Sequence, residues 1–307
     1  MNENYIELKQ RRDVGEIVST YFDFFKQNVK SFTNVFISYN GVFIFLLLGA
    51  SYLLVTGFIG VFNTQSGFDN SSKDESALYI GFGLILFFGV FLVIAALNYS
   101  LASAYIIQYD KKQQVIENRT EVWSIVKSNS SSIIVFILLL VVIYIVYSIV
   151  NLIVSIIPIL GFFASLLMSF GISSWLGVSF MSMFYEKKSP TEALGEGWDL
   201  VKSNFWKCVG TNFILGMLIG ILLLLLLMIP GVIVIVYTWH VVDSGFNVGD
   251  SIVAKIIYTF GLCILLIVSA YSQSLSQFIN GILYFSLHEE KYNIHTREKI
   301  NQIGASE

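Results

Sequence analysis

Six long apolar stretches constrain the fold of this chain more than any other feature of its sequence. Each can supply the roughly 20 apolar residues that a helix needs to cross about 30 Å of hydrocarbon. Backbone polar groups inside lipid must be satisfied within the segment itself, so stretches of this kind form helices. The sequence therefore predicts an all-α, polytopic transmembrane helix bundle of about six spans. The stretches lie near residues 41–62, 78–108, 132–157, 160–185, 208–236 and 252–287.

The composition agrees with a membrane protein. Of the 307 residues, 55% are hydrophobic and 13% are charged, whereas about a quarter of residues are charged in soluble domains. The first 34 residues are polar and amphipathic, so we expect no cleavable signal peptide. Cys208 and Cys263 lie in or beside apolar runs, which favours two small buried hydrophobes over a disulfide or a metal pair.

The distribution of Lys and Arg predicts the orientation in the membrane. If the N-terminus is cytoplasmic, the inner segments hold 16 of the 18 Lys and Arg, and the outer side holds only Lys73 and Lys255. Positively charged loops stay on the cytoplasmic side during insertion, so we expect both termini in the cytoplasm. The inner segments are then 1–34, 109–131, 186–207 and 288–307.

A threefold internal repeat is the second strong feature. Residues 13–28 and 189–204 are copies of equal length, and 118–129 is a shorter third copy. Each opens with Asp, Asn or Ser followed three residues later by Glu, the pattern of a capping box at a helix start, and Pro190 suits a first helical position. Each closes with an aromatic residue, a lysine and an asparagine. These closing residues are Phe22, Lys26 and Asn28; Trp123, Lys127 and Asn129; and Trp198, Lys202 and Asn204.

The three copies therefore predict amphipathic helices at the cytoplasmic face, which we call elbows. One interpretation is that their aromatic and lysine side chains contact lipid headgroups or a cytoplasmic partner. The other is that they only start each hairpin in the right place. Lys207 and Lys255 lie near span ends, where we expect them to extend toward the membrane surface.

Two apolar spans follow each elbow, and the second span of each pair ends alike, in YDKK, YEKK or HEEK. The repeating unit is thus an interfacial helix plus a transmembrane hairpin. We expect a single membrane domain over residues 1–307. Its repeat units are about 13–112, 118–188 and 189–291, followed by a polar cytoplasmic tail at 292–307.

The stretch SPTEALGEGWDLVKSNFW at 189–206 and the IPG segment at 229–231 resemble bacterial membrane proteins of the DUF975 and YciC-like group. That group is similar to the membrane domain of glycerophosphodiester phosphodiesterases, without the catalytic domain. The resemblance implies a multi-pass protein of the bacterial cytoplasmic (inner) membrane. It transfers no catalytic residue, because no segment here is long or polar enough to form a soluble catalytic barrel.

No pattern in the sequence indicates catalysis, a cofactor or a metal. The three histidines lie on separate loops and ends, and no charged residue lies in the middle of a span, where ion-coupled carriers need one. Neutral polar residues form an intramembrane stripe, for which interhelical hydrogen bonds are the favoured interpretation and a substrate lining the alternative. The stripe comprises Asn98, Gln273, Gln277 and Asn280.

These observations favour a non-enzymatic membrane protein, either an accessory subunit of a membrane complex or a lipid-interacting scaffold. The alternative is a permease-type transporter subunit that relies on a separate ATPase. We expect membrane lipids as partners, and other membrane-protein subunits if the protein is an accessory subunit. We expect no nucleic acid, because the basic residues are spread over separate segments. Whether segment 208–260 holds a broken or re-entrant helix at Pro230 stays open.

Overall fold

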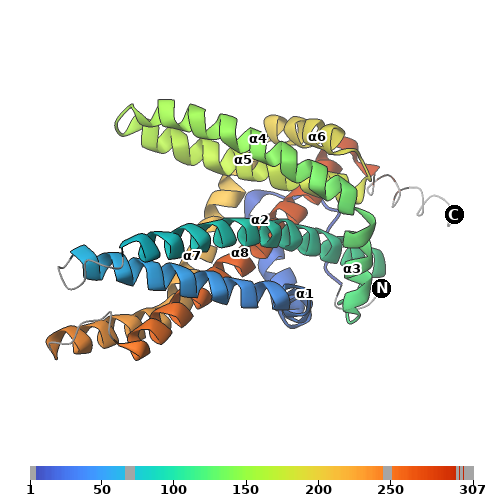
Figure 1. Ribbon diagram of the computed structural model, residues 1–307. Helices are drawn as coiled ribbons and strands as arrows, with labels where there is room; N and C mark the ends of the chain where they lie inside the picture. The colour runs from blue at the N-terminus through green and yellow to red at the C-terminus, as the bar shows by residue number, and fades with distance from the viewer. Residues whose placement is uncertain (1–4, 66–72, 245–250, 295–296, 298–299, 301–307) are drawn as a thin grey trace. The chain divides into compact units, whose positions relative to one another are not determined.

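A computed structural model describes residues 5–65, 73–244, 251–294, 297 and 300. Over these residues the chain forms eight α-helices and no strand (Figure 1). The helices are α1 (Val14–Gln65), α2 (Lys73–Lys112), α3 (Arg119–Ser128), α4 (Ser130–Ser155), α5 (Leu160–Tyr185), α6 (Pro190–Ser203), α7 (Phe205–Asp243) and α8 (Ile252–Tyr292).

Six of these helices, α1, α2, α4, α5, α7 and α8, are long and apolar enough to cross a membrane. Five of them contain a predicted apolar stretch in full, and α4 ends two residues before the stretch 132–157 does. The short helices α3 and α6 precede the pairs α4–α5 and α7–α8. The predicted fold class is therefore confirmed.

The first elbow differs from the other two, because it is the beginning of α1 rather than a separate helix. The backbone leaves the helical conformation at Asn129 (φ −106°, ψ 11°) and at Asn204 (φ −130°, ψ 36°), which separates α3 from α4 and α6 from α7. Asn28 stays inside α1. Its buried amide oxygen accepts a hydrogen bond of 2.9 Å from the Tyr105 hydroxyl, which ties this turn of α1 to α2.

The helix α7 runs without interruption from Phe205 to Asp243, with Pro230 inside it. Segment 208–243 is therefore a single helix and contains no re-entrant turn. The apolar stretch expected to end near residue 236 continues as helix to Asp243, and α8 begins at Ile252.

The turn between α4 and α5 is tight. Ile159 has a positive φ of 61°, and the Leu160 N–H donates to the Pro158 carbonyl at 2.6 Å. A Cβ atom on Gly161 would overlap the Val154 carbonyl oxygen, so only glycine fits where α5 starts.

The chain packs as two compact units, and their boundaries do not coincide with those of the predicted repeat units. The first comprises 1–35, 99–218 and 274–307, and the second comprises 36–98 and 219–273, so α1, α2, α7 and α8 each contribute to both. In the first compact unit, Phe32 packs edge-on against Phe278 with ring centroids 4.5 Å apart. In the second, Phe36 packs in the same way against Tyr271 at 5.0 Å.

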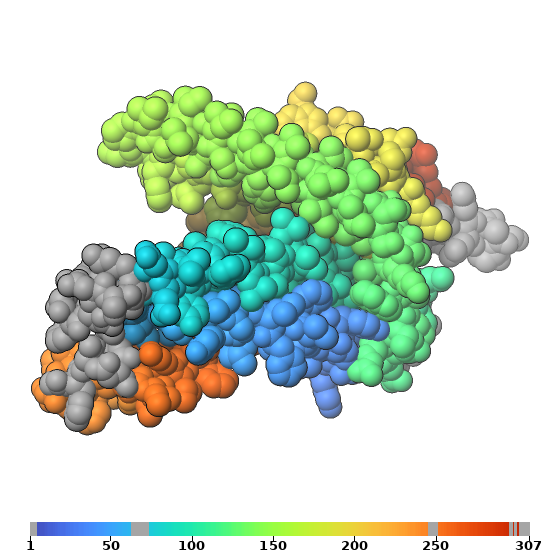
Figure 2. Space-filling model, in the orientation of Figure 1, coloured from blue at the N-terminus to red at the C-terminus, as the bar shows by residue number. Residues whose placement is uncertain are grey.

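Large apolar side chains are exposed along the long helices. On α4, whose surface is light green in Figure 2, Leu138, Val142 and Ile149 are more than half exposed. On α7, Leu224 and Ile229 are exposed to 74% and 71%. Apolar surface of this extent marks contact with lipid or with another protein, as expected of membrane-spanning helices.

Candidate functional site

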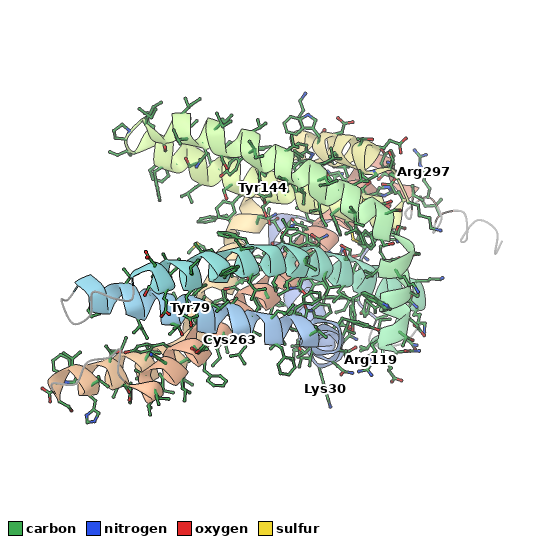
Figure 3. The ribbon with its side chains drawn as sticks, viewed as in Figure 1. Lys30, Tyr79, Arg119, Tyr144, Cys263 and Arg297 are labelled. Carbon is green, nitrogen blue, oxygen red and sulfur yellow. The ribbon has the colours of Figure 1, made fainter. Side chains whose placement is uncertain are left out.

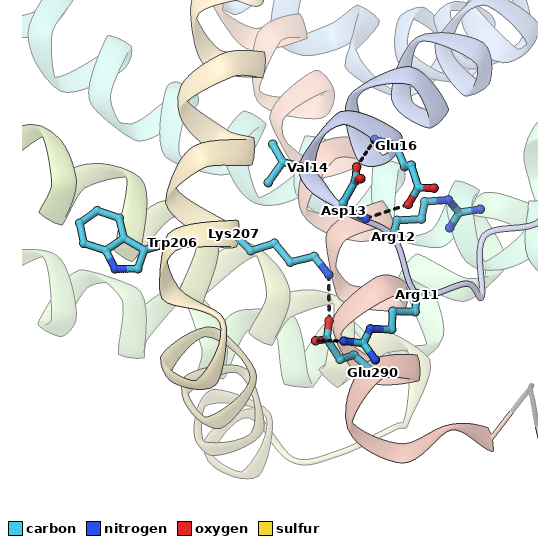
Figure 4. Close-up of a pocket in the computed structure, with 8 residues that line it drawn as sticks. All are labelled: Arg11, Arg12, Asp13, Val14, Glu16, Trp206, Lys207 and Glu290. Carbon is cyan, nitrogen blue, oxygen red and sulfur yellow. Dashed lines mark hydrogen bonds and ion pairs between the residues drawn. The ribbon is translucent and has the colours of Figure 1, made fainter.

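The capping boxes predicted at the elbows form in the first and third copies. The Asp13 carboxylate accepts from the Glu16 N–H at 2.8 Å, and the Glu16 carboxylate accepts from the Asp13 N–H at 2.8 Å (Figure 4). Ser189 and Glu192 make the same reciprocal pair at the start of α6, where Pro190 occupies the first helical position. These caps fix where the two elbows begin, because they satisfy N–H groups that have no partner inside the helix.

The second copy forms only half of its box. The Asn118 side chain accepts from the Thr120 N–H at 3.0 Å, as an N-cap does. The Glu121 carboxylate instead accepts from Lys112 at 2.7 Å and from Gln108 at 2.8 Å, which connects α3 to the end of α2. The hydrogen bonds to Lys112 and Gln108 lower the pKa of Glu121 below its ordinary value.

The elbow aromatics and lysines face outward. Phe22, Trp123 and Trp198 are exposed to 44%, 37% and 50%. Within the part of the chain that the structure describes, the elbow lysines have no ion-pair partner. Lys30, one turn beyond the first elbow lysine, also points away from α1 (Figure 3). The three exposed elbow lysines are Lys26, Lys127 and Lys202.

The elbow asparagines bond back to their own helices; Asn28 is buried, and Asn129 and Asn204 are half-buried. The amide groups of Asn28, Asn129 and Asn204 each donate to the carbonyl four residues earlier, at 2.9, 2.8 and 3.4 Å. This shared bond is a structural role, since it occupies the side-chain donor at the end of each elbow. The three sequence copies are therefore alike in this asparagine bond, although their capping contacts differ.

A charged cluster that the sequence did not predict lies in the first compact unit. It comprises Glu186, Lys188, Glu196, Lys291 and Tyr292, from the end of α5, from α6 and from the end of α8. Lys188 bridges the two carboxylates, at 2.7 Å from Glu186 and 3.4 Å from Glu196. The Lys291 ammonium lies 3.1 Å from Glu196, and the Tyr292 hydroxyl donates to the same carboxylate at 2.9 Å.

The charged cluster holds both of its carboxylates ionised. Burial raises the pKa of Glu186, but hydrogen bonds from Lys188 and from the Tyr284 hydroxyl outweigh it and lower the pKa overall. Burial also raises the pKa of Glu196, and the contacts from Tyr292 and Lys291 outweigh it in the same way. The cluster thus joins α5, α6 and α8 through contacts that need both negative charges.

A pocket of about 600 Å³ lies at the start of α1, between α7 and α8 (Figure 4). Arg11 and Lys207 line it and lie on either side of Glu290, with nitrogen–oxygen distances of 3.3 and 2.9 Å. Lys207 and Trp206 point in opposite directions from α7. Lys207 thus has an ion-pair partner at the end of α8, and its expected extension toward the membrane surface stays a prediction.

The intramembrane polar side chains of the first compact unit bond to one another and to backbone. The Gln277 amide donates to the Ser103 hydroxyl at 2.8 Å and to the Gly177 carbonyl at 3.2 Å. Asn212 donates to Asn280 at 3.2 Å. Gln277 and Asn280 are fully buried, and a Cβ on Gly177 would overlap the Asn280 amide. These contacts are interhelical hydrogen bonds of the kind expected of the stripe, although the Gln277 amide oxygen and the Asn280 amide nitrogen have no hydrogen-bond partner among the described residues.

The second compact unit holds the other two members of the stripe. Asn98 is fully buried, accepts from the Asn40 amide at 3.0 Å and donates to the Ala270 carbonyl at 2.8 Å. Gln273 is half-buried on α8. Asn98 therefore connects α1, α2 and α8 within this unit, where each buried polar group that finds a partner avoids a large desolvation cost.

The sequence contained one signal for the charged cluster. The endings YDKK, YEKK and HEEK supply Asp110, Glu186 and Glu290. Asp110 and Glu290 pair with basic residues far away in the chain, whereas Glu186 pairs with Lys188 of its own ending. Lys9 lies 2.8 Å from Asp110. The repeated endings were interpreted only as marks of a repeat, whereas in the structure they anchor the helix ends.

The fold and these sites define a polytopic helical membrane protein whose charged contacts gather at helix ends and whose intramembrane polar groups are buried. Among the residues described, no group of three or more His, Cys, Asp or Glu could hold a metal ion. Cys208 and Cys263 are both buried and free, as expected. No family model, no curated protein and no solved structure matches the chain.

Proposed function

We propose that this protein is a non-enzymatic, lipid-interacting scaffold of the bacterial inner membrane, with both termini in the cytoplasm. The observation that carries the proposal is the shared form of the three elbows. Each presents an exposed aromatic ring and an exposed lysine without an ion-pair partner in the described chain, while its asparagine is tied back to the backbone.

Aromatic rings and lysines of this kind suit the boundary between headgroups and hydrocarbon. Tryptophan is enriched at that boundary because its ring is largely apolar and its N–H is polar. A lysine whose stem lies along apolar surface can place its ammonium among phosphates. Near an anionic membrane surface each lysine contributes about 1 kcal/mol of binding free energy. Each elbow therefore binds lipid weakly, and the three elbows together hold the protein at a fixed depth in the membrane.

The predicted orientation supports the same proposal. It places all three elbows on the cytoplasmic side, where the leaflet carries anionic lipids. The resemblance to the DUF975 and YciC-like group adds only the expected architecture and bacterial origin. A role as accessory subunit of a membrane complex would use the same exposed rings for a protein partner.

The test compares two double variants with the same change of charge. Lys127→Gln/Lys202→Gln removes two elbow lysines, and Lys111→Gln/Lys187→Gln removes two exposed lysines outside the elbows. Each protein is extracted from its membrane in mild detergent, and mass spectrometry identifies the bound lipids and proteins. We expect an enriched anionic phospholipid on the parent and on the second variant, and a marked loss on the first.

Two outcomes would overturn the proposal. One is a parent protein with no enriched lipid, and the other is an equal loss of lipid from both double variants. A stoichiometric protein partner without enriched lipid would replace the scaffold by an accessory subunit.

A further inference from the structure

An apolar groove of about 360 Å³ lies in the first compact unit, between α5, α6 and the start of α7. Its volume is at the lower end of the range for ligand pockets, roughly 300 to 1,000 Å³. Gly171, Trp175, Trp198, Lys202 and Phe205 are among its lining residues. Because α6 is the third elbow, this groove lies at the membrane depth that the proposed function assigns to the elbows.

The walls of the groove are held in place by contacts within the protein. The Trp175 indole N–H donates to the Leu194 carbonyl at 2.9 Å, and its ring meets Trp198 edge-on with centroids 5.3 Å apart. One wall is thus a fixed pair of indole rings. At Gly171 the helix surface lacks a side chain, and an added Cβ would come within 3.2 Å of the Phe205 ring. A larger side chain at this position would therefore narrow the groove.

Lys202 carries the only charge among the residues found to line the groove. Its side chain is exposed, and among described residues it has no ion-pair partner, unlike the lysines of the charged cluster. An apolar channel with one unpaired cation at its rim is complementary to a molecule that has a long apolar chain and an anionic end. A membrane phospholipid has both.

We propose that the groove binds one acyl chain of an anionic phospholipid, with Lys202 at the lipid phosphate. This inference rests on the proposed function and narrows it to one elbow and one class of lipid. It also gives α6 a role that α3 does not share, since the groove is built from Gly171 and Trp175 of α5 and Phe205 of α7.

The two indoles of the wall can report on the occupant. A variant with Trp123→Phe, Trp206→Phe and Trp239→Phe keeps only Trp175 and Trp198, and the three replaced rings are exposed. The full chain is reconstituted in phosphatidylcholine vesicles that contain a small fraction of phospholipid brominated in the acyl chain. Bromine quenches indole fluorescence on contact. Because Trp198 is half exposed, the part of the quenching that Gly171→Leu removes measures occupancy of the groove.

We expect brominated phosphatidylglycerol to quench at about a fivefold lower fraction than brominated phosphatidylcholine, as one lysine at an anionic lipid allows. Lys202→Gln should abolish this preference, whereas Lys127→Gln on α3 should leave it unchanged. Gly171→Leu fills the groove and should reduce quenching by both lipids. Normal extraction and thermal unfolding of each variant show that it is folded.

Equal quenching by both lipids, or the same preference in Lys202→Gln, would overturn this inference. The parent protein can fail this quenching test and still co-purify with an enriched anionic lipid that Lys127→Gln/Lys202→Gln removes. In that case the proposed function holds, and only the assignment of the lipid to the groove is overturned. If no lipid is enriched, the proposed function fails as well. A protein bound at the groove that blocks quenching would identify an apolar partner helix as the occupant and would also overturn the inference.

Discussion

Two sets of lysines in the first compact unit differ in what they contact. In the charged cluster, Lys188 and Lys291 both lie within 3.5 Å of Glu196. On the elbows, Lys26, Lys127 and Lys202 are exposed without an ion-pair partner among the described residues. The same residue type therefore joins helices in one place and lies exposed on the surface in the other.

The helix α6 supplies Glu196 to the charged cluster and Lys202 to the exposed lysines, which makes the comparison testable. The inner side of α6 carries Glu196, which belongs to the charged cluster, and its exposed side carries Trp198 and Lys202. A change that detaches α6 from α5 should disturb both sets, while a change on one side should disturb only that side.

The largest effect is expected from Gly197→Ala. A Cβ at this position would overlap the Ser179 hydroxyl and lie 2.9 Å from the Ser179 Cα atom, so α6 has to move away from α5. Overpacking at the upper end of its usual cost predicts a loss of about 3 kcal/mol of stability, measured by unfolding in detergent. Gly195→Ala is the control: no atom lies within 4 Å of its Cβ, and a gain of up to about 1 kcal/mol follows from helix propensity. Equal stability of the two variants would contradict the packing described here.

Glu196→Gln should have the next largest effect. It removes the charge that Lys188 and Lys291 share and weakens the hydrogen bond from Tyr292. Charge-assisted hydrogen bonds of this kind contribute about 1.5–3 kcal/mol each, so a loss of about 2 kcal/mol is expected. Asp199→Asn on the exposed side of α6 is the matched control and should change stability by less than about 0.5 kcal/mol. If Glu196→Gln were as stable as that control, the charged cluster would not hold α6.

The pH dependence of stability should report the same cluster. The folded state lowers the pKa of Glu186 and of Glu196 below the ordinary value of 4.5. A carboxylate with a lowered pKa contributes stability above its ordinary value and loses that contribution as the pH falls through the folded pKa. The unfolding temperature in detergent should therefore fall as the pH drops below 4.5. It should fall less steeply in Glu196→Gln, where one of the two carboxylates is absent. Parallel curves for parent and variant would show that Glu196 is not part of this titration.

The smallest effect on stability is expected from the elbow lysines. Lys127→Gln and Lys202→Gln should each change the free energy of unfolding by less than about 0.5 kcal/mol, because neither side chain holds another residue. Unfolding in lipid-free detergent is the suitable measurement, since bound lipid would add its own stabilisation. A loss of 1 kcal/mol or more in detergent would mean that these lysines belong to the fold rather than to a ligand site.

The sequence of the repeat predicted the individual capping contacts of two elbows. Asp13 with Glu16 and Ser189 with Glu192 lie three residues apart, so their pairing depends only on local helix geometry. The same three-residue spacing between Asn118 and Glu121 did not produce a full capping box, because the Glu121 carboxylate bonds instead to Lys112 and Gln108 at the end of α2. Local patterns therefore predicted the elbows and missed the one contact that tertiary packing redirected.

The sequence by itself determined the helical spans and the position of each elbow, because apolar length and capping are properties of contiguous residues. Only the tertiary structure decided which charges pair. Lys291 and Glu196 are 95 positions apart in the chain, and Gly171, Trp198 and Phe205 come from three helices. Contacts of this kind depend on how the helices pack, which no spacing within one segment specifies. That packing left Lys188 inside a cluster and Lys202 at the rim of a groove.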